Sequence, residues 1–264
     1  MNRIFIIRKI AFIFLTLLLP FFPIGQNLAL NNLWIGGYNN YIKIDSDVVR
    51  VNYSWEFQGK KHFIQRAYRY FFIKDTFRVV GDNSIDYDFL IKELSNEKLE
   101  FVGLDPNSRL LSFQDSLQKS LIFRSQDKIA TDTIRFEKLL FQATNCYGSC
   151  PAMIYQIDNS KEFKFEGEKF AIKQGFYKGV IPDKVYSDLL SILAISELDK
   201  IENNGTFNID APTYTIELHY NNNVKFIKTA FLPLALERLL TFLMALPNKV
   251  ELLETRKEEF RFSQ

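Results

Sequence analysis

Both cysteines of the chain stand in one short string, Asn145-Cys146-Tyr147-Gly148-Ser149-Cys150-Pro151. Two thiols at this distance can form a disulfide, stay free, act as a redox dithiol or bind a metal ion. Their spacing is one residue longer than in the redox Cys-x-x-Cys motif, and no βαβ pattern surrounds it. Gly148 can adopt a positive φ, which would let the two sulfurs meet across a tight loop. We therefore expect a structural disulfide between Cys146 and Cys150.

Asp210, which precedes Pro212, is a second candidate for chemistry. Its carboxylate either accepts backbone N–H groups in a turn before a strand or faces the cysteine string and forms a polar pocket with it. The candidate functional loop therefore comprises Tyr147, Gly148, Ser149, Pro151 and Asp210. His62 and His219 are the only histidines, and each is interpreted as a surface or rim residue of a predicted strand.

No catalytic motif accompanies these residues. The sequence contains no phosphate-binding, zinc-protease or nucleophile-elbow string. No base is found near the cysteines that would activate a thiolate. We therefore assign no catalytic, metal-binding or cofactor-binding residue and expect no cofactor.

Residues 1–25 have the three parts of a secretory signal peptide. A basic start leads into an apolar stretch over Ile10–Leu19, and Gly25 stands at the expected cleavage site. The alternative is an uncleaved membrane anchor, but the apolar part is shorter than the roughly 20 residues that cross a bilayer. We expect a mature chain that begins near Gln26, is periplasmic or secreted, and has its cysteines in oxidising conditions.

The composition indicates a folded globular protein: 264 residues, 47% apolar and 24% charged. Loss of the three basic residues in the signal segment leaves 30 Lys and Arg against 31 Asp and Glu, a net charge of −1. Such a chain lacks the basic excess of a nucleic-acid binder. The later apolar run Phe231–Leu246 is broken by Glu237 and Arg238, so we expect no membrane span after signal cleavage.

Residues 32–125 predict an all-β domain, a small barrel or a sandwich, because aromatic and β-branched runs alternate with turn residues. Strands are expected near Trp34 and over 41–44, 48–57, 63–73, 76–80, 87–91, 99–104, 110–113 and 120–123. The second half of the aromatic strand 67–73 is expected to be buried on both faces. The first strand, with Trp34, looks similar to that of lipocalin-like barrels, which hold one apolar ligand, although the same aromatic residues also fill dry cores.

Residues 126–133 are polar and predict a linker to an α+β domain over 134–247. This domain is expected to have an antiparallel sheet and two helices. Its predicted elements are strands over 134–144, 152–157 and 163–165, a helix that begins at Pro182, a hairpin over 213–220 and 224–230, and a deeply packed helix over 233–246. Residues 248–264 carry equal numbers of basic and acidic residues and predict a polar, solvated tail.

The Cys-Tyr-Gly-x-Cys-Pro string, followed by a strand, resembles the hallmark of an uncharacterised domain of exported bacterial proteins, frequently from Bacteroidota. The resemblance covers about residues 134–247 and also includes Phe163–Gly167, Gly175, Asp210–Thr213 and Pro233. The chain departs from the pattern at Met153, where an aromatic residue is common, and at Ile209, where a threonine is common. The resemblance implies export and a domain boundary. It implies no activity, because the family is known only as a domain of unknown function.

Two functions follow from these observations. The first is a non-catalytic module of the cell envelope that binds another protein, a glycan or a small apolar ligand. The second is a thiol-redox protein or an enzyme with a site at the Cys146–Pro151 loop and Asp210. We favour the first function because the loop lacks a neighbouring base.

Overall fold

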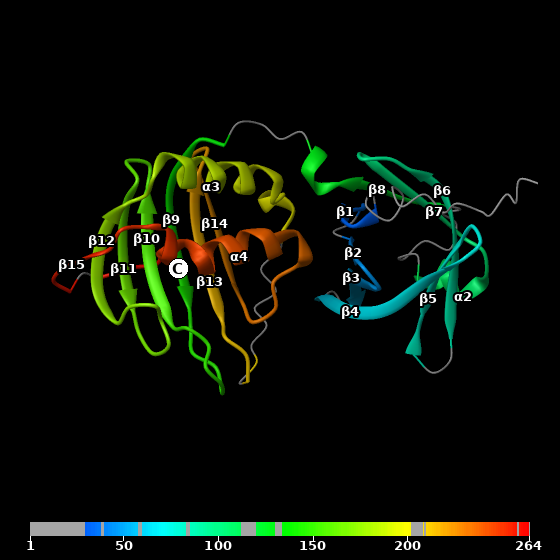
Figure 1. The fold of residues 1–264 in the computed structure, drawn as a ribbon, viewed down its shortest axis with the longest axis horizontal. Helices are drawn as coiled ribbons and strands as arrows, with labels where there is room; N and C mark the ends of the chain where they lie inside the picture. The colour runs from blue at the N-terminus through cyan, green and yellow to red at the C-terminus, as the bar shows by residue number, and fades with distance from the viewer. Residues whose placement is uncertain are drawn as a thin grey trace, which may run out of the picture.

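The computed structural model describes residues 30–37, 40–57, 60–82, 85–111, 120–129, 134–201, 208, 210–257 and 259–263, without the side chains of residues 53–57, 60–64 and 109–111. The chain forms a β-barrel and, beside it, a sheet that helices cover on one face (Figure 1). This confirms the predicted fold class, an all-β domain followed by an α+β domain. Residues 1–25, predicted to be a signal peptide, lie outside the described residues. None of the described helices has the length and apolar character needed to cross a membrane.

Eight antiparallel strands form a closed barrel. They follow one another in chain order, and β1 pairs with β8 to complete the ring, so no sheet edge is left unpaired. Lipocalins have the same up-and-down order. The strands are β1 (Leu33–Ile35), β2 (Tyr41–Asp45), β3 (Val48–Phe57), β4 (Lys60–Ile73), β5 (Thr76–Val80), β6 (Asp86–Leu94), β7 (Lys98–Gly103) and β8 (Leu121–Ser125).

Aromatic and branched side chains fill the barrel interior. Trp34, Phe77 and Phe123 are at most 2% exposed, and the indole N–H of Trp34 donates to the carbonyl of Leu30 at 3.0 Å. Where described side chains line the interior, a space of about 20 Å³ is left. This is room for about one water molecule, which needs roughly 10–15 Å³ of such space. The described part of the interior is therefore filled by side chains, and an apolar ligand of the barrel stays a prediction.

One predicted barrel strand overlaps a helix. The sequence predicts a strand over 110–113, whereas residues 110 and 111 belong to α2 (Pro106–Leu111), and residues 112 and 113 lie outside the described part. Asp105 caps this helix, because its Oδ1 accepts the backbone N–H groups of Asn107 at 2.8 Å and Ser108 at 3.0 Å. An aspartate followed by proline is a helix-start signal, since the carboxylate satisfies free N–H groups and proline fits the first turn.

The end of β4 is buried on one face only, so the prediction of burial on both faces is wrong. Tyr68 and Tyr70 are 8% exposed and belong to the barrel core, whereas Phe71 and Ile73 are 45% and 40% exposed. A barrel wall is a single layer with solvent outside. Only alternate residues of each strand therefore reach the interior.

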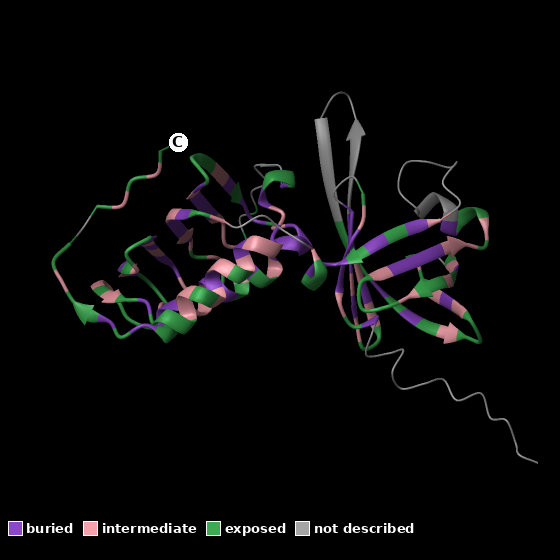
Figure 2. Cartoon of the chain, turned by 90° about the horizontal axis from the view of Figure 1, so that it is seen from above, coloured by how far each residue is buried: buried purple, intermediate pink, exposed green. Residues whose placement is uncertain are grey.

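The second unit is a seven-stranded antiparallel sheet in the order β14-β13-β9-β10-β11-β12-β15. Helices α3 (Asp183–Ile195) and α4 (Glu237–Ala245) cover one face of it (Figures 1 and 2). The strands are β9 (Phe136–Ala143), β10 (Met153–Asp158), β11 (Glu162–Gly167), β12 (Gly175–Val180), β13 (Tyr214–Tyr220), β14 (Asn223–Thr229) and β15 (Leu253–Glu254). Short 3-10 helices are η3 (Leu198–Lys200), η4 (Leu234–Leu236) and η5 (Leu246–Lys249).

The predicted helices and hairpin are present, but the structure also has strand β12, which the sequence does not predict. Its residues are half-buried or exposed without a regular alternation, because it lies near the edge of the sheet. It begins at Gly175, whose φ of 111° favours glycine. The predicted last helix is also divided, since 3-10 helices flank α4 on both sides.

The segment after η5 is not the solvated tail that the sequence predicts over 248–264. Val250 and Leu252 are 8% and 7% exposed and belong to the core of the second unit. The following two residues form β15, which pairs with β12 at Tyr177 and Lys178. The prediction was wrong because it considered the many charged residues of this segment and not its few apolar side chains.

Residues 255–257 and 259–263, which we call the C-terminal strap, cross the face of the sheet that the helices leave open (Figure 2). Ser263 donates its backbone N–H to Oε2 of Glu217 on β13 at 2.6 Å. Phe262 packs edge-on against Phe226 on β14, with ring centres 6.4 Å apart. The strap therefore reaches from one edge of the sheet to the other.

The chain passes from β8 into the second unit through the 3-10 helix η2 (Gln126–Lys128), where the sequence predicts a linker over 126–133. Gln126 is 1% exposed, and its side-chain amide donates to the carbonyls of Ile195 at 3.2 Å and Ala235 at 2.8 Å. The start of the predicted linker is therefore anchored, while residues 130–133 lie outside the described part. The domain boundary itself stays a prediction.

Truncation of the full chain after Pro247 should lower the free energy of unfolding by about 3 kcal/mol, since it removes two buried apolar side chains, Val250 and Leu252. Urea denaturation measures the difference. A chain that ends at Glu254 keeps both side chains and β15, and it should retain most of this stability. An equal loss in the two truncated chains would show that the C-terminal strap, and not the buried pair, provides it.

Candidate functional site

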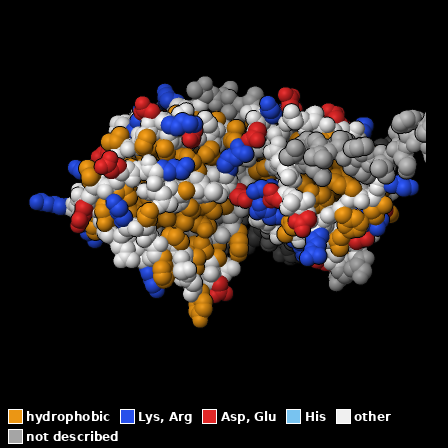
Figure 3. Space-filling model, in the orientation of Figure 1, with side chains coloured by type: hydrophobic (Ala, Val, Ile, Leu, Met, Phe, Trp, Pro, Cys, Tyr) orange, Lys and Arg blue, Asp and Glu red, His pale blue; other side chains and the backbone are white. Residues whose placement is uncertain are grey.

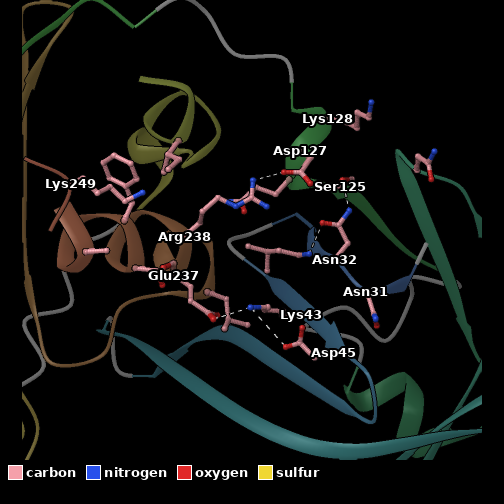
Figure 4. Close-up of a pocket in the computed structure, with 18 residues that line it drawn as sticks. Asn31, Asn32, Lys43, Asp45, Ser125, Asp127, Lys128, Glu237, Arg238 and Lys249 are labelled. Atoms are coloured by element: carbon pink, nitrogen blue, oxygen red, sulfur yellow. Dashed lines mark hydrogen bonds and ion pairs between the residues drawn. The ribbon is translucent and has the colours of Figure 1, made fainter. Parts of the chain in front are cut away.

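A cavity of about 790 Å³ lies between the barrel and the second unit. Its volume falls within the roughly 300–1,000 Å³ that small-molecule sites occupy, and such sites are often found between domains. Polar groups and a few apolar side chains from both units line it (Figure 4). The lining residues are Asn31, Asn32, Leu33, Lys43, Asp45, Asn96, Ser125, Gln126, Asp127, Lys128, Ile192, Leu234, Glu237, Arg238, Thr241, Phe242, Ala245 and Lys249.

A network of four charged groups connects the two units at this cavity. Lys43 on β2 and Arg50 on β3 both bind Glu237 at the start of α4. Lys43 Nζ lies 2.9 Å from Oε1 of Glu237, and Arg50 contacts both carboxylate oxygens at 3.1 and 3.0 Å. Asp45 accepts from Arg50 at 3.2 Å and lies 3.9 Å from Lys43, which stands between the two carboxylates in Figure 4. The network fixes α4 against the barrel.

The charge state of Glu237 depends on this network. Partial burial raises the pKa of Glu237, but hydrogen bonds and charges from Lys43 and Arg50 outweigh it and hold the pKa below its ordinary value. The pKa of Arg50 is raised, because the contacts with Glu237 and Asp45 outweigh the lowering effect of burial. Glu237 and Arg50 are therefore both charged at neutral pH.

The opposite wall of the cavity is held by a second set of contacts. Arg238 on α4 forms an ion pair with Asp127 on η2 at 2.5 Å. On the barrel side, the side-chain amide of Asn32 donates to the hydroxyl of Ser125 at 2.6 Å. Figure 4 shows both contacts facing the same space as the Lys43 network. The cavity is therefore held open between two sets of polar contacts.

Two lysines at the cavity, Lys128 and Lys249, have no carboxylate partner among the described residues. Lys249 Nζ lies 5.2 Å from the centre of the Phe242 ring, which attracts a cation weakly. The carboxylates that line the cavity, Asp45, Asp127 and Glu237, each already contact a cation. The cavity thus offers unpaired positive charge and no unpaired carboxylate.

The cysteine string forms the expected disulfide. Cys146 and Cys150 are bonded, and their Cα atoms lie 5.6 Å apart. The loop that they close is exposed: Tyr147 is 91% exposed, and Gly148 and Ser149 are exposed too. Pro151 after the second cysteine is half-buried. The loop therefore presents a tyrosine ring to solvent.

The role expected for Gly148 is not found. Its φ lies outside the left-handed region, and a Cβ at this position would meet Sγ of Cys146 at 3.8 Å, an ordinary contact. Three intervening residues are enough to close the loop without a positive φ. The disulfide therefore does not depend on a glycine here.

Asp210 lies at the same end of the sheet as the disulfide loop. The backbone of Thr144, just before the loop, donates to the carbonyl of Thr213 at 3.0 Å, so the two chain segments run side by side. Asp210 is exposed, and its N–H donates to Oδ1 of Asn208 at 2.9 Å. Within the described part of the chain, no hydrogen bond or ion pair joins Asp210 to the loop. A shared site there stays a prediction.

The histidines do not lie near the disulfide. His219 is on β13, and its Nε2 lies 2.6 Å from Oε1 of Glu217, whose carboxylate is buried under the C-terminal strap. The side chain of His62 on β4 is outside the described set. Among the described residues, no group of three or more His, Cys, Asp or Glu could hold a metal ion.

One signal in the sequence indicates the cavity between the units. Glu237 and Arg238 interrupt the otherwise apolar run Phe231–Leu246. Charged residues within a deeply packed helix need partners of opposite charge. Glu237 and Arg238 find theirs outside the helix, on β3 and on η2. The partners Lys43 and Asp127 could not be identified without the fold, because they lie far away in the sequence.

Residues 137–247 match the model of a domain of unknown function, DUF6438. The DUF6438 domain extends from β9 to η5, and it contains the disulfide loop, Asp210 and the α4 wall of the cavity. The barrel lies outside the match. No curated protein and no solved structure matches the chain.

Glu237→Gln should lower the free energy of unfolding at pH 7 by less than about 1 kcal/mol, because the network is partly exposed. The folded-state pKa of Glu237 is depressed, so its contribution is present above the unfolded value near 4.3 and is lost as the pH falls through the folded pKa. Urea melts should thus converge for the wild type and the variant in acid. Glu162→Gln, an exposed residue on β11, is the control. If the free energies of unfolding of the wild type and Glu237→Gln still differed in acid, the ionised form of Glu237 would not be the source of the stabilisation.

The native protein should contain no reactive thiol. Replacement of Cys146 and Cys150 by serine should lower the free energy of unfolding by about 2 kcal/mol or less, since a short loop restricts the unfolded chain little. Thiol titration and circular dichroism with thermal melting measure these effects. A double variant that does not fold would show that the disulfide does more than hold its own loop.

Proposed function

We propose that this protein is a non-catalytic binding protein of the cell envelope, and that it holds a polar, anion-bearing small molecule between the barrel and the DUF6438 domain. One observation carries the proposal: an open cavity of about 790 Å³ whose polar groups come from both units. The barrel interior, by comparison, has only about 20 Å³ where it is described. The space between the units is thus the better place for a ligand.

The charges at the cavity favour an anion. Lys128 and Lys249 lack carboxylate partners in the described structure, whereas each lining carboxylate contacts a cation. A carboxylate or phosphate group would form charge-assisted hydrogen bonds with these lysines. Leu234 and Phe242 supply apolar surface for the remainder of such a molecule.

The same contacts favour binding over catalysis. A general base needs a lone pair that is free to take a proton from the substrate. In this cavity, Glu237 accepts from two cations, and Asp127 is paired with Arg238. These carboxylates are held as structural anions that orient the two units.

The alternative function is a thiol-redox protein or an enzyme at the Cys146–Pro151 loop with Asp210. The exposed disulfide and the exposed Tyr147 favour it, because a reductant or a partner would reach them easily. An activating base in contact with the sulfurs is missing from the described residues. Rapid reduction of the native disulfide by mild reductant would support this alternative over the binding protein.

Export is part of the same proposal. It rests on the tripartite segment over residues 1–25, on the Cys146–Cys150 disulfide, and on the resemblance of the Cys-Tyr-Gly-x-Cys-Pro string to the Bacteroidota-type exported domain. Mass spectrometry of the native protein, isolated with its cell fraction, tests it. Loss of the first 25 or so residues is expected.

Lys249→Gln should weaken the binding of anions about tenfold, a loss of about 1.4 kcal/mol. The measurement is calorimetric titration of the full chain with phosphate, citrate and glucuronate at low salt. At least one of these anions should bind, and affinity should fall as salt is added. Lys184→Gln removes the same charge from an exposed position on α3 and is the control. Equal binding by both variants, or no binding of any anion, would rule out the proposed site.

A further inference from the structure

Large apolar side chains gather at one end of the seven-stranded sheet. A row of cross-strand partners from β14 to β12 defines this end: Thr229, Tyr214, Ala143, Met153, Gly167 and Gly175. Five strand spacings of roughly 4.8 Å make the row about 24 Å long. Four exposed apolar residues, which we call the loop-tip residues, lie within four positions of this row along the chain: Tyr147 (91% exposed), Phe170 (45%), Ile172 (60%) and Phe231 (53%). Soluble surfaces seldom collect such side chains without a partner.

The loop between β11 and β12 turns two of these residues outward. Ala171 packs against the core of the unit, and its N–H donates to the carbonyl of Glu168 at 3.2 Å. Phe170 and Ile172, on either side of Ala171, are therefore exposed. Phe170 has a φ of 62°, a left-handed conformation that is rare for an aromatic residue. Unfavourable backbone of this kind is typical of functional loops.

The disulfide holds the third residue in place. Tyr147 stands in the ring that Cys146 and Cys150 close, and this short ring adds little to the stability of the whole fold. Residues 144–152 include no charged side chain. The loop thus presents an amphipathic tyrosine ring on a rigid, uncharged support.

Two lysines flank the apolar residues of the β11–β12 loop. Lys169 and Lys173 are exposed, and neither has a carboxylate partner among the described residues. Lys169 Nζ lies 4.9 Å from the centre of the Phe170 ring, and Lys173 Nζ donates to the carbonyl of Leu252 at 3.1 Å. The string Lys-Phe-Ala-Ile-Lys therefore has an apolar tip between two cations.

The charges of this end balance. Its described loops contain two carboxylates, Glu168 and Asp210, against the two lysines. Apolar contact must therefore provide most of the affinity for any partner. Figure 3 shows hydrophobic side chains down to the lower tip of the sheet unit, the end at which β9 finishes in Figure 1. A protein partner would need a matching hollow for each protruding side chain, whereas a bilayer admits them one by one.

We propose that this end of the DUF6438 domain docks on the surface of a phospholipid bilayer. The side chains of Tyr147, Phe170 and Ile172 enter the headgroup region, and Lys169 and Lys173 reach the phosphate groups. Tyrosine is enriched at this depth, and lysine keeps its charge in the polar layer while its stem lies on apolar surface. Because few side chains enter, docking is reversible. None of these residues lines the cavity between the units, so the inference does not depend on the proposed function.

The test is quenching of a tryptophan by lipids that carry bromine near the headgroup. Tyr147→Trp places the reporter on the disulfide loop. Val180→Trp is the control, since Val180 is 68% exposed and pairs with Glu162 at the opposite end of the sheet. Each variant of the full chain is titrated with phosphatidylcholine vesicles, with and without phosphatidylglycerol. Residues 1–25 are apolar and would bind vesicles by themselves, but they would not favour one reporter over the other.

Tryptophan 147 should be quenched at least three times more strongly than tryptophan 180, and more strongly with phosphatidylglycerol. Phe170→Asn and Ile172→Ser, each added to Tyr147→Trp, should raise the lipid concentration at half-maximal quenching at least fivefold. Asparagine adopts the left-handed conformation readily, so Phe170→Asn should not lower the melting temperature. Val180→Ser, in the same background, should leave quenching unchanged.

Three results would overturn the inference: no quenching at position 147 with either vesicle, equal quenching at both positions, or quenching at position 147 that neither Phe170→Asn nor Ile172→Ser weakens. The first result would leave the loop-tip residues to a protein partner. Lys249→Gln should dock normally. A protein that docks on vesicles but binds no anion would reject the proposed function and keep this inference, and the reverse result would do the opposite.

Discussion

The buried side-chain amide of Gln126 joins the end of the last barrel strand to both helices of the DUF6438 domain. It donates to the carbonyl of Ile195 at the end of α3 and to that of Ala235 just before α4. Loss of these acceptors would leave the buried amide N–H without a partner, which would lower the free energy of unfolding by roughly 1–3 kcal/mol. The amide therefore fixes η2, whose Asp127 and Lys128 line the cavity between the units.

Much of the fold could be predicted from the sequence, because strands and amphipathic helices repeat with their own periods. The barrel strands and helix α3 follow such patterns, as does the β13–β14 hairpin. The predictions are wrong where a short sequence pattern fits two structures or where the apolar pattern of a strand is weak. Asp105-Pro106 fits both a turn and a helix cap, and β12 is too exposed to alternate clearly.

The candidate sites could be predicted much less well. The disulfide was predicted because its two residues are close in sequence. The contact of Arg50 with Glu237 joins positions 187 residues apart, and no pattern in a single sequence indicates it. Burial creates these sites, and burial of a particular side chain depends on the whole fold.

The C-terminal strap determines where anything attached to the end of the chain would emerge. Ser263 is bound to Glu217 in the middle of β13, on the face of the sheet away from α3 and α4. Figure 3 shows the surface on the helix side, where basic and acidic side chains gather at the junction of the two units. A fluorophore or an affinity tag joined after Gln264 would extend from the opposite face. It would lie away from α4, which lines the cavity between the units, and immobilisation through it would turn the helix side of the protein toward the solution.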